Sequence, residues 1–273
     1  MFKYGGLALL PALVLLTGCP RPCRPGIAPQ TAQQALDRVN NNLSQIQAPV
    51  QYKGFASFRF RDAKGKDRRV LGQDASLIFA QPHSLRFDIR STLAGTIAQF
   101  GSNDERFWLW VEPETNKLWW GRWASLGSGS SQLPLPADDL IDSLMLRPLP
   151  TTQADGNPPD LREAEGAYYL VYQRLSSTRE IKLDPAPPYQ PIEIIDRTPD
   201  NQIQMRAILD KYSRIDDTGP YTPRKYVIYW PLDEAEMRLD ATRVALRPDL
   251  PPETFAFPER WAGEVEELDA QQQ

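Results

Sequence analysis

The predicted fold follows from the stretch SLRFDIRSTLAGTIAQFGSNDERFWLWVEPETNKLWWG, Ser84–Gly121. In its first segment, Leu85, Phe87 and Ile89 alternate with polar side chains, a period of two that is typical of a half-buried β-strand. Three further strand-like segments follow, separated only by short connections rich in Gly, Asn, Asp and Pro. Parallel strands need long crossover connections, so these short ones predict an antiparallel meander.

Strand-like alternation continues on both sides of this stretch, and helical spacing interrupts it twice. Residues 53–80 and 167–247 hold further short alternating segments between turn residues. Helical spacing appears in residues 31–46, where Thr31 is a predicted N-cap, and again in residues 138–145 after an acidic first turn. The sequence therefore predicts a mainly β (α+β) fold of roughly a dozen strands, one strongly curved sheet with two helices available to cover it.

The N-terminal segment predicts export. Lys3 precedes an apolar run that is too short to span a bilayer and has the layout of a secretory signal. The run ends in LLTGC, which resembles the lipobox of bacterial lipoproteins and implies a signal peptide over residues 1–18 with Cys19 as the lipidated first residue. The alternative is an ordinary signal peptide with a cysteine nearby. Pro20, by resemblance to proteobacterial sorting rules, favours the outer membrane over the inner one.

The rest of the chain is predicted to form one domain. Residues 19–30 have the proline-rich composition of a tether, residues 31–260 form the domain, and residues 261–273 form a polar tail. The formal net charge is −4, with no basic block suited to phosphate contacts, so nucleic acid is a poor candidate partner.

Catalytic and metal chemistry find little support in the sequence. The single histidine, His83, lies in a turn, and no GxSxG motif accompanies it. The acidic pair at residues 138–139 fits a helix start, and the pair at residues 216–217 fits a turn. The two cysteines, Cys19 and Cys23, lack the spacing of a zinc site. The chain is therefore predicted to be non-enzymatic, with no metal and no cofactor.

A family resemblance rests on the succession Gln81–Gly121. Its proline-marked turn, its LRFDI strand, its small-residue strand and its aromatic FWLW strand look like the first half of the LolA/LolB group of lipoprotein carriers and acceptors. The helix near residues 138–145 and the closing LPPETFAFP, residues 250–258, also resemble that group. The resemblance implies an incomplete antiparallel β-barrel whose concave face is lidded by helices around an apolar cavity for acyl chains.

One face of the predicted sheet supplies the candidate ligand-binding residues. Alternation places nine apolar side chains on the face assigned to the cavity: Phe58, Phe60, Leu77, Phe79, Leu85, Phe87, Ile89, Phe107 and Leu109. A plain hydrophobic core is the alternative, because alternation identifies the buried face without showing whether space remains inside it. Trp108 and Trp110 point to the opposite face, either as core under a covering segment or as interface anchors.

These features lead to two functional hypotheses. The first is a lipid-anchored envelope protein, in the outer membrane facing the periplasm, that binds acyl chains of a lipid or lipoprotein for transfer or localisation. The second is a structural or sensory lipoprotein that uses the same half-barrel to bind an envelope protein through Trp108 and Trp110. The second hypothesis requires an exposed aromatic patch.

Overall fold

The computed structural model describes residues 28–29, 31–61, 65–112, 116–125, 137–216, 218–259, 261 and 263–268. The predicted signal peptide, Cys19, Cys23 and nearly all of the tether lie outside these residues. In the part of the chain that is described, no helix combines the length and apolarity needed to cross a membrane.

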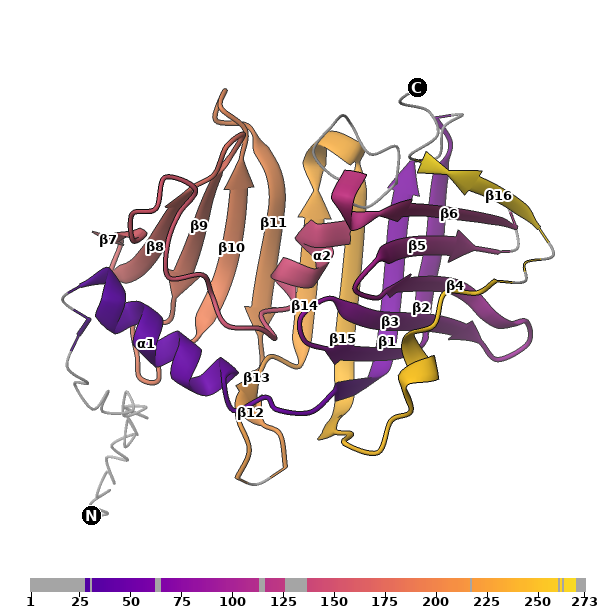
Figure 1. The fold of residues 1–273 in the computed structure, drawn as a ribbon, viewed down its shortest axis with the longest axis horizontal. Helices are drawn as coiled ribbons and strands as arrows, with labels where there is room; N and C mark the ends of the chain where they lie inside the picture. The colour runs from indigo at the N-terminus through magenta and orange to yellow at the C-terminus, as the bar shows by residue number, and fades with distance from the viewer. Residues whose placement is uncertain are drawn as a thin grey trace, which may run out of the picture.

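Fourteen strands form one open, strongly curved sheet (Figure 1). Its order is β16-β6-β5-β4-β3-β2-β1-β15-β14-β11-β10-β9-β8-β7. The first half contains β1 (Val50–Arg61), β2 (Asp67–Ala80), β3 (Ser84–Ser91), β4 (Gly95–Ser102), β5 (Arg106–Val111) and β6 (Lys117–Arg122). The second half contains β7 (Asp160–Ala164), β8 (Ala167–Gln173), β9 (Thr178–Leu183), β10 (Pro191–Arg197), β11 (Ile203–Asp210), β14 (Lys225–Trp230) and β15 (Ala235–Leu246), and β16 is Glu264–Glu267. A separate hairpin joins β12 (Ser213–Arg214) to β13 (Tyr221–Thr222).

The predicted antiparallel meander is confirmed. Consecutive strands from β2 to β6 pair antiparallel with one another. The sheet does not close into a barrel, because β16 and β7 lie at its two edges. The mainly β class, with one large curved sheet and helices over one face, is therefore confirmed.

Two α-helices cover the same face of this sheet, which we call the inner face (Figure 1). Helix α1 is Ala32–Leu43, and the Thr31 side chain caps it by accepting a hydrogen bond from the Gln34 backbone N–H at 3.2 Å. Helix α2 is Ala137–Ser143. The buried side chains of both helices pack with those of the inner face in one core cluster. Burial of these apolar surfaces is the main force that holds the helices on the sheet.

The segment predicted as a polar tail contains an edge strand. Strand β16 pairs in parallel with β6, and the Lys117 Nζ atom contacts carboxylate oxygens of Glu264 at 2.9 Å and Glu266 at 2.6 Å. Main-chain pairing does not require apolar side chains, and charged side chains are common on edge strands because they discourage pairing with other molecules. The polarity of this segment therefore hides its strand character.

Short 3₁₀ turns complete the structure. They are η1 (Trp123–Ser125), η2 (Pro231–Asp233) and η3 (Pro252–Phe255). Turn η3 leads into the chain segment after Phe255 that lies against the outer face of the sheet, opposite the helices.

Candidate functional site

The nine side chains predicted to line the concave face lie together on the inner face. Leu77 pairs with Phe87, Phe87 with Phe100, and Phe100 with Leu109, so apolar side chains run across four neighbouring strands. On β1 the rings of Phe58 and Phe60 stack with their centroids 5.0 Å apart. None of the nine is more than 4% exposed, and all belong to the core cluster that includes both helices. The structure thus brings them together beneath a cover, and their role in binding a ligand stays a prediction.

Helix α2 and the turn after it bury their apolar side chains against this face. Leu140, Ile141 and Leu144 are at most 1% exposed. The Tyr226 hydroxyl donates a hydrogen bond to the Leu144 carbonyl at 3.3 Å and lies 3.1 Å from the Tyr52 hydroxyl. Burial raises the pKa of Tyr52 to about 12, so its hydroxyl keeps its proton at neutral pH. These contacts fix the end of α2 on the sheet.

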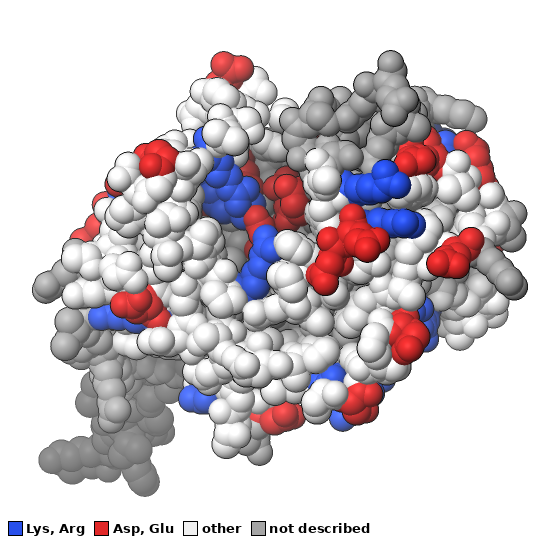
Figure 2. Space-filling model, in the orientation of Figure 1, with Lys and Arg blue, Asp and Glu red and all other residues white. Residues whose placement is uncertain are grey.

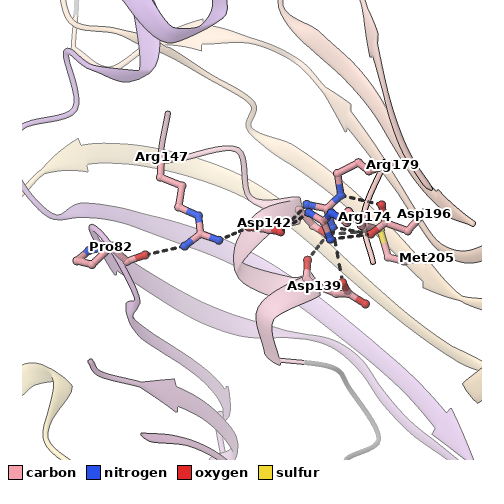
Figure 3. Close-up of polar contacts among 9 residues, drawn as sticks. Pro82, Asp139, Asp142, Arg147, Arg174, Arg179, Asp196 and Met205 are labelled. Carbon is pink, nitrogen blue, oxygen red and sulfur yellow. Dashed lines mark hydrogen bonds and ion pairs between the residues drawn. The ribbon is translucent and has the colours of Figure 1, made fainter. Parts of the chain in front are cut away.

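A cluster of six charged side chains joins α2 to the second half of the sheet (Figure 3). Arg179 on β9 donates from Nε and Nη2 to the two oxygens of Asp196 on β10, at 2.7 and 2.5 Å. Its Nη1 donates to Asp142 on α2 at 2.5 Å. Arg179 is 5% exposed and Asp196 is 2% exposed. We call this set the α2 ion-pair cluster; its members are Asp139, Asp142, Arg147, Arg174, Arg179 and Asp196.

Three guanidinium groups converge on Asp142. Besides Arg179, the Arg174 Nη2 atom lies 3.0 Å from Oδ2, and Arg147 donates from Nη2 to Oδ1. Burial opposes ionisation of Asp142, but the three arginines outweigh it and hold the pKa of this carboxyl far below its usual range. Arg147 also donates to the Pro82 carbonyl at 3.3 Å, which links α2 to the turn between β2 and β3.

Asp139 occupies the opposite electrostatic environment. Burial and, to a lesser extent, the negative charges of Asp138, Asp196 and Asp142 together raise the pKa of its carboxyl to about 7, and Arg179 opposes this rise. The Arg179 Nη2 atom lies 3.6 Å away but is already engaged by Asp196. Two carboxyl groups on one short helix therefore titrate in different pH ranges.

We expect Asp139 to make a contribution to the free energy of unfolding that falls as the pH rises from 5 to 7. The pKa of Asp139 in the folded state lies above the value of about 3.9 for a free aspartate, so the folded state binds more protons than the unfolded state between these two pKa values. The stability that this extra proton binding contributes is lost as the pH rises through the folded-state pKa. The slope from one such group is at most about 1.4 kcal/mol per pH unit. Urea unfolding of Asp139→Asn at pH 5, 6 and 7 should lack this component.

Asp138→Asn is the matched control for this measurement, because Asp138 is the exposed neighbour on the same helix turn. It should keep most of the slope. Identical slopes in the wild type and in Asp139→Asn would contradict the assignment. Asp142 has a lowered pKa, so its contribution to stability is present above about pH 4 and is lost only in stronger acid.

The outer face carries a second, smaller cluster built on Trp108 and Trp110. These rings pack with Leu118, and the chain's own C-terminal segment covers them. The Trp108 and Phe257 ring centroids lie 5.4 Å apart, and those of Trp110 and Trp261 lie 4.9 Å apart. Trp108 is 2% exposed and Trp110 is 9% exposed.

The two tryptophans are therefore packed within the protein, and the exposed patch required for an interface role is not formed by them. Gly101 makes the packing of Trp108 possible, since a Cβ atom at this position would lie 2.2 Å from the Trp108 ring. Sequence alternation identifies the outward direction of both rings correctly. It does not reveal that the segment containing Phe257 and Trp261 returns to cover them.

No protein-family model matches this sequence, and no curated protein is similar to it by sequence. Solved structures do match. A domain from Vibrio parahaemolyticus, provisionally named an outer membrane lipoprotein-sorting protein domain, has a TM-score of 0.50 at 10% identity over 82% of this chain and 97% of that one. A DUF1329 family protein from Desulfovibrio piger has a TM-score of 0.51 at 10% identity over 83% of this chain and 97% of that one.

The fold is LolA/LolB-like. A LolA superfamily protein from Nitrosomonas europaea also matches, with a TM-score of 0.49 and 13% identity over 83% of this chain and 98% of that one. At sequence identities this low, structural similarity establishes the fold alone. The function has to be argued from the residues of this chain. In this LolA/LolB-like sheet the inner face and its helical cover form the candidate site.

The α2 ion-pair cluster is the part of the site that sequence reasoning missed. The sequence identifies Asp139 only as part of a helix start and indicates no role for Arg179. The sequence does contain a signal for this cluster. Arg179 shares one face of β9 with Ile181 and Leu183, and Asp196 shares one face of β10 with Ile194. A charged residue at a position whose alternation is otherwise apolar indicates a buried partner, and Arg179 and Asp196 are indeed directly paired.

Proposed function

We propose that this protein binds acyl chains of a lipid or lipoprotein at its inner face, beneath α2. The observation that carries the proposal is the continuous apolar inner face of an open LolA/LolB-like sheet, covered by short helices. Each methylene removed from water contributes about 0.8 kcal/mol, so a dozen contribute roughly 10 kcal/mol. An apolar sheet face is a surface that can supply this energy without any polar chemistry.

Because α2 is short, a ligand can displace it from the inner face that it covers. It has seven residues, too few for stability as an isolated helix, so its position depends on packing and on the α2 ion-pair cluster. A bare apolar face would be an aggregation hazard, and a helix that packs on it protects the protein when no ligand is bound. In this proposal acyl chains replace the apolar contacts of Leu140, Ile141 and Leu144.

The proposal includes location and chain organisation. Residues 1–18 are the signal peptide, acylated Cys19 anchors residues 19–30 as a tether, and the domain faces the periplasm from the outer membrane. Names of similar structures support an envelope role, since one refers to outer membrane lipoprotein sorting. The role is that of a non-enzymatic carrier or acceptor.

The alternative function is a protein-binding lipoprotein with Trp108 and Trp110 as anchors. It lacks the exposed aromatic surface that it requires, because both rings are covered.

The test begins with the Cys19→Ser chain, which cannot be acylated and should leave the membrane fraction. Native mass spectrometry of this detergent-free protein, followed by organic extraction, should show a lipid that is released on denaturation. Phe87→Asp should abolish lipid uptake, because it places a charge on the inner face. The matched control is Phe55→Asp, since Phe55 is 52% exposed and its variant should retain uptake.

Far-UV circular dichroism checks that each variant is folded. A lipid-free mass for the Cys19→Ser chain, together with no binding of a fluorescent fatty acid, would overturn the proposal. Equal uptake by the Cys19→Ser chain with and without Phe87→Asp would remove the inner face as the binding surface.

A further inference from the structure

A pocket opens between α2, the segment that follows it and strands β8 and β9. Its volume is about 460 Å³, and its lining includes Asp142, Met145 and residues from 147 to 154, together with side chains from β8 and β9. This volume lies within the range of small-ligand sites. Figure 2 shows a hollow near the middle of this side of the molecule, where basic and acidic side chains gather. We call it the α2 pocket.

One part of the α2 pocket is apolar. Met145, Leu149 and Ile181 line it, together with the ring of Tyr172. The Tyr172 hydroxyl donates to the Pro150 carbonyl at 3.0 Å, so its polar atom is engaged and the ring faces the remaining space as apolar surface. This wall suits a hydrocarbon chain.

The other part of the α2 pocket is cationic. Arg147, Arg174 and Arg179 all line it. The side chains of Arg147 and Arg174 are 30% and 36% exposed, whereas that of Arg179 is 6% exposed. The two more exposed arginines are therefore the ones that an entering ligand can reach.

Both of these arginines keep hydrogen-bond donors in reserve. A guanidinium group has five N–H donors. Among the described residues, Arg174 donates one hydrogen bond, to Asp142, and Arg147 donates one to Asp142 and one to the Pro82 carbonyl. Two arginines would neutralise Asp142 and Asp196, but three surround this pair of carboxylates.

The charge balance also favours an anion. Asp196 is engaged by both sides of the Arg179 guanidinium, and Asp142 is ionised. The pKa of Asp139 is raised to about 7, so this carboxyl carries only part of its charge at neutral pH. Three cationic groups then face little more than two negative charges.

We propose that the α2 pocket binds an anionic amphiphile whose carboxylate or phosphate head accepts hydrogen bonds from Arg147 and Arg174. Its hydrocarbon chain lies against Met145, Leu149 and Ile181. Charge-assisted bonds from arginine to such heads are among the strongest polar contacts in proteins. This inference rests on the proposed function for the chain and adds a headgroup preference to it.

The test compares ligands with the same chain and different heads. Dodecyl phosphate, dodecanoate and dodecanol are titrated into the delipidated Cys19→Ser full chain, and inorganic phosphate is titrated alone. We expect both anionic amphiphiles to bind at least tenfold more tightly than dodecanol. The double variant Arg147→Gln/Arg174→Gln should reduce this preference to within threefold, measured as the ratio of each anionic amphiphile's affinity to the dodecanol affinity of the same variant. Arg206→Gln is the matched control, because Arg206 pairs with Glu193 outside this pocket.

Each remaining outcome has a distinct meaning. Equal binding of the three amphiphiles by the wild type would overturn the headgroup preference and leave the proposed function standing. An anion preference that survives in the double variant would move the head away from Arg147 and Arg174 and overturn the site. Inorganic phosphate bound as tightly as dodecyl phosphate would show an anion site without a chain-binding wall. Failure of all three amphiphiles to bind would overturn the proposed function as well.

Discussion

Replacing Arg179 with alanine should lower the free energy of unfolding by about 3–5 kcal/mol. The reason is the charge left behind: Asp196 is 2% exposed and would lose its bidentate partner, and Asp142 would lose one of its three arginines. An unpaired buried charge is costly because the interior cannot replace the hydration that it lost. Urea unfolding of the Cys19→Ser chain at pH 7, with and without the substitution, measures the effect.

The matched control for this measurement is Arg206→Ala. Arg206 on β11 also pairs with a carboxylate, Glu193, at 2.6 Å, but its side chain is 47% exposed. An exposed ion pair contributes only about 0–1 kcal/mol. If the two substitutions cost the same, burial would not be what makes the α2 ion-pair cluster important.

A second variant separates the charge from the packing. The double replacement Arg179→Met/Asp196→Leu removes both partners and leaves apolar side chains of similar size. We expect it to regain much of the stability lost in Arg179→Ala. A double variant as unstable as the single one would assign the loss to packing instead of to the unpaired carboxylate.

Replacing Trp108 with alanine should also cost about 3–5 kcal/mol, the usual range for truncating a large buried aromatic side chain. The Trp108 ring contacts Phe257 from the C-terminal segment and lies directly over Gly101. Its loss should therefore loosen residues 256–261 as well as the sheet. Hydrogen exchange of this segment and the urea midpoint measure the two effects together.

Leu93→Ala is the control for Trp108→Ala, since Leu93 is 98% exposed and its truncation should change stability by no more than about 0.5 kcal/mol. A small effect of Trp108→Ala on unfolding, with unchanged exchange in residues 256–261, would contradict the packing role and would favour a surface function for this ring. Faster exchange limited to that segment would show that Trp108 holds the segment without supporting the sheet.

The inner face was accessible to sequence reasoning because it depends on local periodicity. Leu85, Phe87 and Ile89 must share a face in any extended strand, and short connections allow little besides antiparallel pairing. The same reasoning located α2, since an acidic first turn precedes its apolar residues. These features follow from backbone geometry within a few residues.

The candidate site was only partly accessible, because its polar half joins separate elements. Asp142 on α2 meets Arg179 on β9 only when the helix docks on the second half of the sheet. The alternation of β9 places Arg179 on the same face as apolar residues, but it does not indicate which carboxylate Arg179 contacts. The cover over Trp108 likewise depends on where the chain runs after η3.

Side-chain alternation and connection length are therefore enough to predict the strands of the meander, their antiparallel succession and the apolar face that they share. Three further features become visible only in the folded chain: three arginines surround Asp142, Phe257 and Trp261 cover the outer tryptophans, and Glu264–Glu267 extends the sheet edge. Those contacts join residues far apart along the chain, so they depend on strand register, sheet curvature and helix docking, which no local pattern encodes.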